Sequence, residues 1–325
     1  MNFRTEFFIP TSKHQMQLSS KVVTLGSCFS DVVGNSLKNN KLEVYVNQMG
    51  TLFNPLSIFK VLSLALQNHE PDERLYLQQD ELWFHYDFHS SMVGNSKEEL
   101  QNKLVEALIT LKKSIENTDF LAITFGTAFV HQLQNTPVFV ANCHKQPKYL
   151  FEKDLLSVKD ICKAYGALQK IFTQHNLKPR IILTVSPVRH TREGIPQNQV
   201  SKSILRAACH YLSTDYEDIA YFPSYEIMLD DLRDYRFYKP DLIHPSEMAE
   251  AYIFEKFGAT YFSSDLKQFV EEWQSTKKAL AHRPFNEKTE AHQKFLQKLR
   301  AELLRFSEKI DVSDELALLE ERIVE

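Results

Sequence analysis

One stretch constrains this chain more than any other: a short apolar run that leads into a glycine, a serine and a helix. Residues 21–40 begin with that run, reach Gly26 and Ser27, and then carry apolar residues at helical spacing from Asp31 onward. In a strand–turn–helix unit, the unpaired N–H groups and the positive end of the helix dipole face the turn. The segment therefore puts Ser27 where either a small nucleophile or a helix cap is expected.

The same alternation of strand and helix continues along the chain. Continuous apolar runs at 120–125 and 180–185 have the length and composition of buried strands, and amphipathic helical patterns separate them. Buried strands that alternate with helices predict an α/β fold with a parallel sheet covered on both faces. The turns that hold Gly26, Gly50, Gly126 and residues 186–190 all follow strands, so they should meet at the edge where such sheets bind ligands.

Three stretches qualify this simple alternation. Residues 74–92 alternate and are rich in aromatic side chains, which predicts an inserted hairpin, and residues 154–175 have a helical pattern. Residues 262–325 carry two amphipathic helical patterns with a densely charged face. We therefore expect a main domain over 1–261 and a C-terminal helical extension over 262–325. The extension packs either on the main domain or on a second copy, as in a homo-oligomer.

Composition excludes several classes of protein. A net charge of −4 over 325 residues gives no basic excess, so a nucleic-acid partner is not expected. The four cysteines are scattered without a Cys-x-x-Cys pair, which indicates reduced thiols rather than a disulfide framework. No run approaches the ~20 apolar residues of a membrane span, and the N-terminus lacks the pattern of a secretory signal. We expect a cytoplasmic protein with no membrane partner.

Asp241 and His244 supply the groups that a serine nucleophile needs. A serine hydroxyl requires a base, and the base requires a group that orients it. Only two residues separate Asp241 from His244, so a tight turn can bring the carboxylate to Nδ1 and leave Nε2 for the Ser27 hydroxyl. Imidazole suits this role because its pKa lies near working pH. The alternative is structural: a helix cap at Ser27, a turn former at Asp241 and a helix start at His244.

Residues 26–30, Gly-Ser-Cys-Phe-Ser, resemble the signature that gives the GSCFA family its name, with Ser30 where the name has alanine. Other segments that resemble the same family are 3–6, 53–55, 142–145, 186–190, 201–202 and 244–246. The resemblance spans roughly residues 3–257 and does not extend over the helical tail.

GSCFA proteins are similar to the SGNH, or GDSL-like, hydrolases. This resemblance implies a three-layer α/β/α flavodoxin-like fold, a triad of Ser27, His244 and Asp241, and no cofactor. It matches Gly50 to the glycine whose N–H joins that of Ser27 in the oxyanion hole. The asparagine that usually completes the hole falls at Ala128, so a replacement is needed: Asn142, which we favour, or the hydroxyl of Thr127. The difference matters because one lost oxyanion donor costs about 10²–10³ in rate.

Four loop residues are candidates for contact with substrate, namely His89, Thr127, Arg189 and His190. Each is equally well explained as a solvated or hydrogen-bonded loop residue. The scattered histidines and Cys143 do not form a ligand set, so no metal is expected. Cys28, beside Ser27, is interpreted as a packing residue because adjacent side chains on a turn point different ways.

Together these features predict an SGNH-type serine esterase. The expected substrate, by analogy with the superfamily, is an O-acyl group such as acetate on a carbohydrate or another small acyl ester. Acyl transfer to a sugar would use the same residues. A module that binds carbohydrate or acts as a scaffold, without chemistry, stays open because the third-block asparagine is missing at Ala128.

Overall fold

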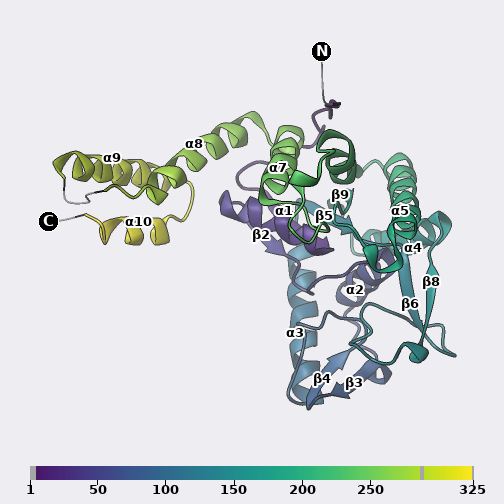
Figure 1. Ribbon diagram of the computed structural model, residues 1–325. Coiled ribbons are helices and arrows are strands. Elements are labelled where there is room, and N and C mark those ends of the chain that lie inside the picture. The colour runs from purple at the N-terminus through teal and green to yellow at the C-terminus, as the bar shows by residue number, and fades with distance from the viewer. Residues whose placement is uncertain (1–4, 286–288, 324–325) are drawn as a thin grey trace.

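The computed structural model describes residues 5–285 and 289–323 of the chain. A parallel sheet lies at the centre of the main body (Figure 1). Its five strands have the order β2–β1–β5–β9–β10. The strands are β1 (Lys21–Gly26), β2 (Glu43–Val46), β5 (Phe120–Phe125), β9 (Arg180–Val185) and β10 (Ile219–Phe222). Numbered in chain order within this sheet, they follow 2-1-3-4-5, which is the flavodoxin-like order. The predicted α/β fold is confirmed.

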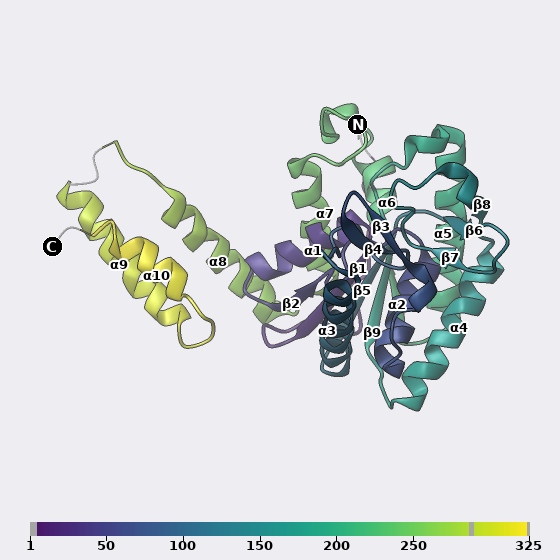
Figure 2. The ribbon, with the colours of Figure 1, turned by 90° about the horizontal axis from the view of Figure 1, so that it is seen from below.

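Helices cover both faces of the sheet and make three layers (Figure 2). Because successive side chains of a strand point to opposite faces, Val22 and Val23 belong to different cores. The core on the Val22 side contains α1 (Cys28–Asn39) and α7 (Glu247–Tyr261). The core on the Val23 side contains α2 (Pro55–Gln67), α3 (Lys97–Glu116), α4 (Val158–Gln174) and α5 (Ile195–Asp215). After β10 come a short helix, α6 (Ser224–Glu226), and a π-helical turn (Ile227–Asp231).

Antiparallel strands interrupt the alternation twice. Strands β3 (Tyr76–Gln79) and β4 (Leu82–His85) pair as a hairpin inside the aromatic stretch 74–92. Strands β7 (Phe139–Val140), β6 (Phe129–Leu133) and β8 (Phe151–Leu155) form a separate three-stranded sheet. The predicted helix over 154–175 is therefore wrong at its start, because Asp154 and Leu155 pair with β6. The helix begins at Val158, where Ser157 and Asp160 form a capping box.

The C-terminal helices α8 (Ser264–Ala281), α9 (Glu290–Phe306) and α10 (Ser313–Glu320) project from the α1 side of the body (Figures 1 and 2). The sequence patterns predicted two helices here, and α10 is a third. The indole N–H of Trp273, a fully buried residue of α8, donates to the carbonyl of Asn39 at 3.0 Å. Lys41 Nζ pairs with the Glu315 carboxylate at 2.8 Å. The arm is thus attached to the end of α1 by a buried aromatic side chain and an ion pair.

Within the described ranges, no helix combines the length and the apolar character needed to cross a bilayer.

Candidate active site

Ser27 lies where β1 ends and α1 begins, in the N-cap position of the helix. Its side chain makes no capping hydrogen bond, and Oγ is buried with no hydrogen-bond partner in the described part of the chain. The preceding Gly26 has φ +129°, and a Cβ there would lie 2.2 Å from the Thr124 carbonyl oxygen, so only glycine fits. Ser27 therefore does not act as a cap. Because the residue is 1% exposed, a substrate reaches Oγ only when covering groups move.

The loop that holds Asp241 and His244 has the geometry of an orienting acid and its base. His244 Nδ1 donates to Asp241 Oδ2 at 2.7 Å, since an ionised carboxylate only accepts hydrogen bonds. The backbone N–H groups of Ile243 and His244 donate to Asp241 Oδ1 at 2.9 and 3.0 Å. These two N–H groups and then the imidazole lower the pKa of Asp241 to about 2. Asp241 is therefore ionised at neutral pH and fixes the His244 proton on Nδ1, which leaves Nε2 as an acceptor.

Arg189 fixes this loop to the edge of the sheet. Its backbone N–H donates to the Ile243 carbonyl at 3.1 Å, and Nη1 donates to the Leu242 carbonyl at 3.3 Å. The guanidinium carbon lies 4.1 Å from the centre of the Tyr238 ring. In this structure Arg189 therefore positions the turn that carries His244; direct contact with substrate stays a prediction.

The nucleophile turn lies at the same edge. A Cβ on Gly126, the residue after β5, would lie 3.1 Å from Ser27 Cβ. The carboxyl ends of β1, β5 and β9 thus bring the Ser27 turn and the Arg189 loop to one side of the sheet. Among the described residues no hydrogen bond joins Ser27 Oγ to His244, so the triad is not closed in this conformation and stays a prediction.

The predicted oxyanion donors have other partners here. The Ser27 N–H donates to the Thr124 carbonyl at 3.0 Å, and the Gly50 N–H donates to the Asn47 carbonyl at 2.8 Å. Either group must turn away from its carbonyl before it can hold an oxyanion. The Asn142 amide oxygen accepts from the His144 N–H at 2.9 Å, and the Asn142 N–H donates to the Tyr86 carbonyl at 3.1 Å. Asn142 is thus tied to the end of the hairpin, and no contact of the described chain joins it to Ser27.

His89 lies against Gly50. A Cβ on Gly50 would come within 2.6 Å of His89 Cβ, so this glycine leaves room for the histidine. The Ser91 N–H donates to His89 Nδ1 at 3.2 Å. Burial lowers the pKa of His89, while the nearby carboxylate of Asp31 acts in the opposite direction. His89 therefore lies near Asp31 at the start of α1, and its contact with substrate stays a prediction.

Thr127 and His190 are engaged within the protein. Thr127 Oγ1 lies 3.1 Å from Ser201 Oγ and accepts from the Phe129 N–H at the same distance. His190 Nε2 lies 3.5 Å from the Glu193 carboxylate, and burial lowers the pKa of the imidazole. Their predicted roles as substrate contacts would require these contacts to be shared or broken.

Lys202 belongs to this edge as well, although its sequence motif suggested no role. The residue is 1% exposed, and Nζ donates to the Gly126 carbonyl at 2.8 Å and the Ser186 carbonyl at 2.7 Å. Burial lowers its pKa to about 7, and Cys28 acts in the opposite direction. The signal in the sequence is a lysine at the spacing of the buried face of α5, whose other members are Asn198, Ser201, Leu205, Ala208, Cys209 and Leu212.

Cys28 is partly exposed and follows Ser27 directly. Burial and the Asp31 carboxylate raise the pKa of its thiol, whereas Lys202 lowers it. Since the net direction is upward, the thiol stays protonated at neutral pH, and the thiolate is the reactive form. Cys28 is therefore a weaker nucleophile than its position at a helix N-terminus suggests.

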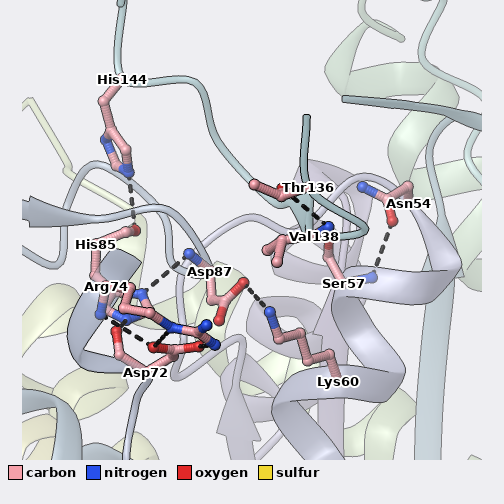
Figure 3. Close-up of polar contacts among 10 residues, drawn as sticks. All are labelled: Asn54, Ser57, Lys60, Asp72, Arg74, His85, Asp87, Thr136, Val138 and His144. Atoms are coloured by element: carbon pink, nitrogen blue, oxygen red, sulfur yellow. Dashed lines mark hydrogen bonds and ion pairs between the residues drawn. The ribbon is translucent and has the colours of Figure 1, made fainter. Parts of the chain in front are cut away.

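The histidines around the hairpin serve to hold it in place (Figure 3). His85 Nδ1 accepts from the Asp87 N–H at 3.1 Å, and His85 Nε2 lies 3.1 Å from the Asp72 carbonyl. His144 Nε2 lies 2.9 Å from the His85 carbonyl, while the buried Asp87 pairs with Lys60 of α2 at 2.6 Å. Across residues 5–285 and 289–323, no group of three or more His, Cys, Asp and Glu side chains is arranged to hold a metal ion.

Comparison with known proteins gives two family matches and one structural match. Residues 21–257 match the model of the GSCFA family, and residues 273–325 match that of the GSCFA domain protein, C-terminal domain. The expectation that the family resemblance stops before the helical tail is therefore wrong. No curated protein matches the chain. A crystal structure of a carbohydrate esterase family 3 from Talaromyces cellulolyticus is similar over 78% of this chain and 99% of that chain, with 10% identity and a TM-score of 0.32.

Proposed function

This chain belongs to the GSCFA family, and from that premise we propose that it is an SGNH-type serine hydrolase that cleaves O-acyl esters. One observation carries the proposal. Asp241 and His244 share a 2.7 Å hydrogen bond at the same sheet edge as Ser27, whose buried hydroxyl has no hydrogen-bond partner in the described part of the chain. Such a hydroxyl needs a base in order to attack a carbonyl. An imidazole can serve when a carboxylate holds one of its ring nitrogens and leaves the other free to accept the hydroxyl proton.

The reaction would run in two steps on these residues. Ser27 Oγ forms a bond to the ester carbon and passes its proton to His244 Nε2, while the electron pair of the C=O bond moves to the oxygen. When that tetrahedral oxyanion collapses, the bond to the leaving alcohol breaks and His244 gives the alcohol its proton. Water then repeats the sequence on the acyl–Ser27 ester and releases the acid. Asp241 keeps its negative charge and orients His244 throughout.

For the substrate we propose an acyl group, such as acetate, on a carbohydrate. Tyr235 supports this choice because it is 65% exposed and lies beside the loop that holds His244. Its ring centre is 5.4 Å from the Arg189 guanidinium carbon. An exposed ring offers an apolar face with a polar tip, which suits the mixed surface of a sugar. Transfer of the acyl group to a second sugar would use the same catalytic residues.

A binding module without chemistry is the second candidate. The observation in its favour is that the N–H groups of both Ser27 and Gly50 donate to backbone carbonyls. An oxyanion hole assembled from them therefore needs a local rearrangement when substrate binds.

Labelling with a fluorophosphonate separates the two candidates. The wild-type protein should take up one label, and Ser27→Ala should take up none. Ser36→Ala, a control on the same helix outside the site, should label like the wild type. A wild type that binds short acyl esters but never reacts with the reagent would rule out the hydrolase and leave the binding module.

A further inference from the structure

Residues 126–128 form the turn in which Ala128 stands where the resemblance expects an asparagine. Ser201 and Lys202 of α5 hydrogen-bond to this turn. The Ala128 N–H donates to Ser201 Oγ at 2.7 Å, and the same hydroxyl lies 3.1 Å from Thr127 Oγ1. Lys202 Nζ donates to the Gly126 carbonyl at 2.8 Å. Residues 126–128 are thus held, one after another, by two consecutive side chains of α5.

The Lys202 ammonium is buried without a counter-ion. An ammonium has three N–H donors, and two of them point to the carbonyls of Gly126 and Ser186. No described carboxylate lies within ion-pair distance, and the titratable groups that face Nζ are Cys28 on α1, His190 after β9 and Tyr225 on α6. Burial of a cation without a counter-ion costs free energy, and a negative charge formed nearby would offset that cost.

The charge of Lys202 acts on the nucleophile turn. It lowers the pKa of the Cys28 thiol, which follows Ser27 directly, and Cys28 in turn raises the pKa of Lys202. Gly126 connects the two in space, since its carbonyl accepts from Lys202 and a Cβ added to it would lie 3.1 Å from Ser27 Cβ. The N-terminus of the 12-residue α1 adds a partial positive charge at the same turn.

We propose that Lys202 stabilises the oxyanion formed when Ser27 attacks the ester, in place of the amide that is absent at Ala128. This inference rests on the hydrolase proposed above. The protonated form of Lys202 is the active one; it transfers no proton while the oxyanion forms and collapses, and its third N–H is the donor available to the developing negative charge. A cation in a water-excluded site is an effective oxyanion donor, and removal of one such donor costs about 10²–10³ in rate.

The test compares fluorophosphonate labelling and ester hydrolysis in matched variants. Lys202→Met should slow both by about 10²–10³. Lys202→Gln keeps N–H donors without the charge and should lose as much; it replaces the methionine variant if that one does not fold. Lys202→Arg, which keeps the charge, should retain part of the wild-type rate. The control Lys163→Met, on the exposed face of α4, should react as fast as the wild type. The ratio of wild-type to Lys202→Met rates should fall as pH rises from 6 to 9, because Lys202 then loses its proton.

Alkylation of Cys28 by iodoacetamide gives a second readout that needs no catalysis. Below pH 7, where Lys202 carries its charge and favours the Cys28 thiolate, Cys28 should be alkylated more slowly in Lys202→Met than in the wild type, and the two rates should converge near pH 9. A merely structural lysine would give equal rates at every pH. If the wild type labels and Lys202→Met labels equally fast with an unchanged Cys28 profile, the role of Lys202 is refuted and the hydrolase survives. If the wild type does not label at all, the hydrolase is refuted. The Cys28 profile then decides separately whether Lys202 stabilises negative charge at this turn.

Discussion

Replacement of Lys202 by methionine should change how the stability of the protein depends on pH. Burial lowers the pKa of Lys202 from 10.5 to about 7, so between these values the folded chain lacks a proton that the unfolded chain carries. Stability of the wild type should therefore rise with pH through this window. One pKa unit is worth about 1.36 kcal/mol, so the pKa difference between the unfolded and folded chain corresponds to about 5 kcal/mol. This destabilisation is fully present below pH 7 and absent above pH 10.5.

Urea unfolding at pH 6, 7.5 and 9 measures this effect. Between pH 6 and pH 9 the wild type should gain roughly 2.5 kcal/mol relative to Lys202→Met. The loss of two hydrogen bonds to carbonyls in the variant is independent of pH and cancels. The facing groups do not mask the result, because burial raises the pKa of Cys28 and of Tyr225 and lowers that of His190, which keeps all three mainly uncharged. Parallel pH profiles for the two proteins would contradict this prediction, because they would mean that Lys202 has an ordinary pKa in the fold.

Three further substitutions test the site and its support. Asp241→Asn removes the acceptor that fixes the His244 tautomer, so the fluorophosphonate labelling rate should fall by about 10²–10⁴ with little change in thermal stability; an unchanged rate would remove Asp241 from the triad. Arg189→Met should slow labelling by about tenfold through a looser His244 loop, by analogy with other misplaced catalytic groups, and a thermal melt should show little loss, whereas a rate equal to wild type would mean the loop holds itself. Trp273→Ala empties a fully buried site in α8 and should cost about 3–5 kcal/mol in urea unfolding; a loss below about 1 kcal/mol would show that the arm is attached by other contacts.

The sheet could be predicted from sequence because its central strands are apolar throughout. Residues 22–26, 120–125 and 181–185 are buried on both faces, and such runs have few other structural explanations. The last two residues of β8, Asp154 and Leu155, were assigned to a helix because this strand mixes charged and apolar residues and lies directly before a real helical pattern. These residues are extended because they pair with β6, and a pattern in the local sequence gives no information about that pairing.

The candidate site was predictable only where the chemistry is local. Asp241 and His244 are three residues apart, so one turn determines their hydrogen bond. The partners of the Ser27 and Gly50 N–H groups, and the place of Asn142 beside the hairpin, depend on contacts between distant segments. Lys202 was missed as a functional residue because a lysine on a helix is usually exposed, and only the fold shows that this one lies under two strand ends.

We propose that Ser27, rather than its neighbour Cys28, is the nucleophile. The most direct test is to react the protein with an activated acetyl ester, quench it with acid within one turnover, and locate the acetyl group by tandem mass spectrometry. We expect acetyl on the oxygen of Ser27, stable to neutral hydroxylamine and absent from Ser27→Ala. Acetyl on the sulfur of Cys28, removed by neutral hydroxylamine and retained in Ser27→Ala, would contradict it.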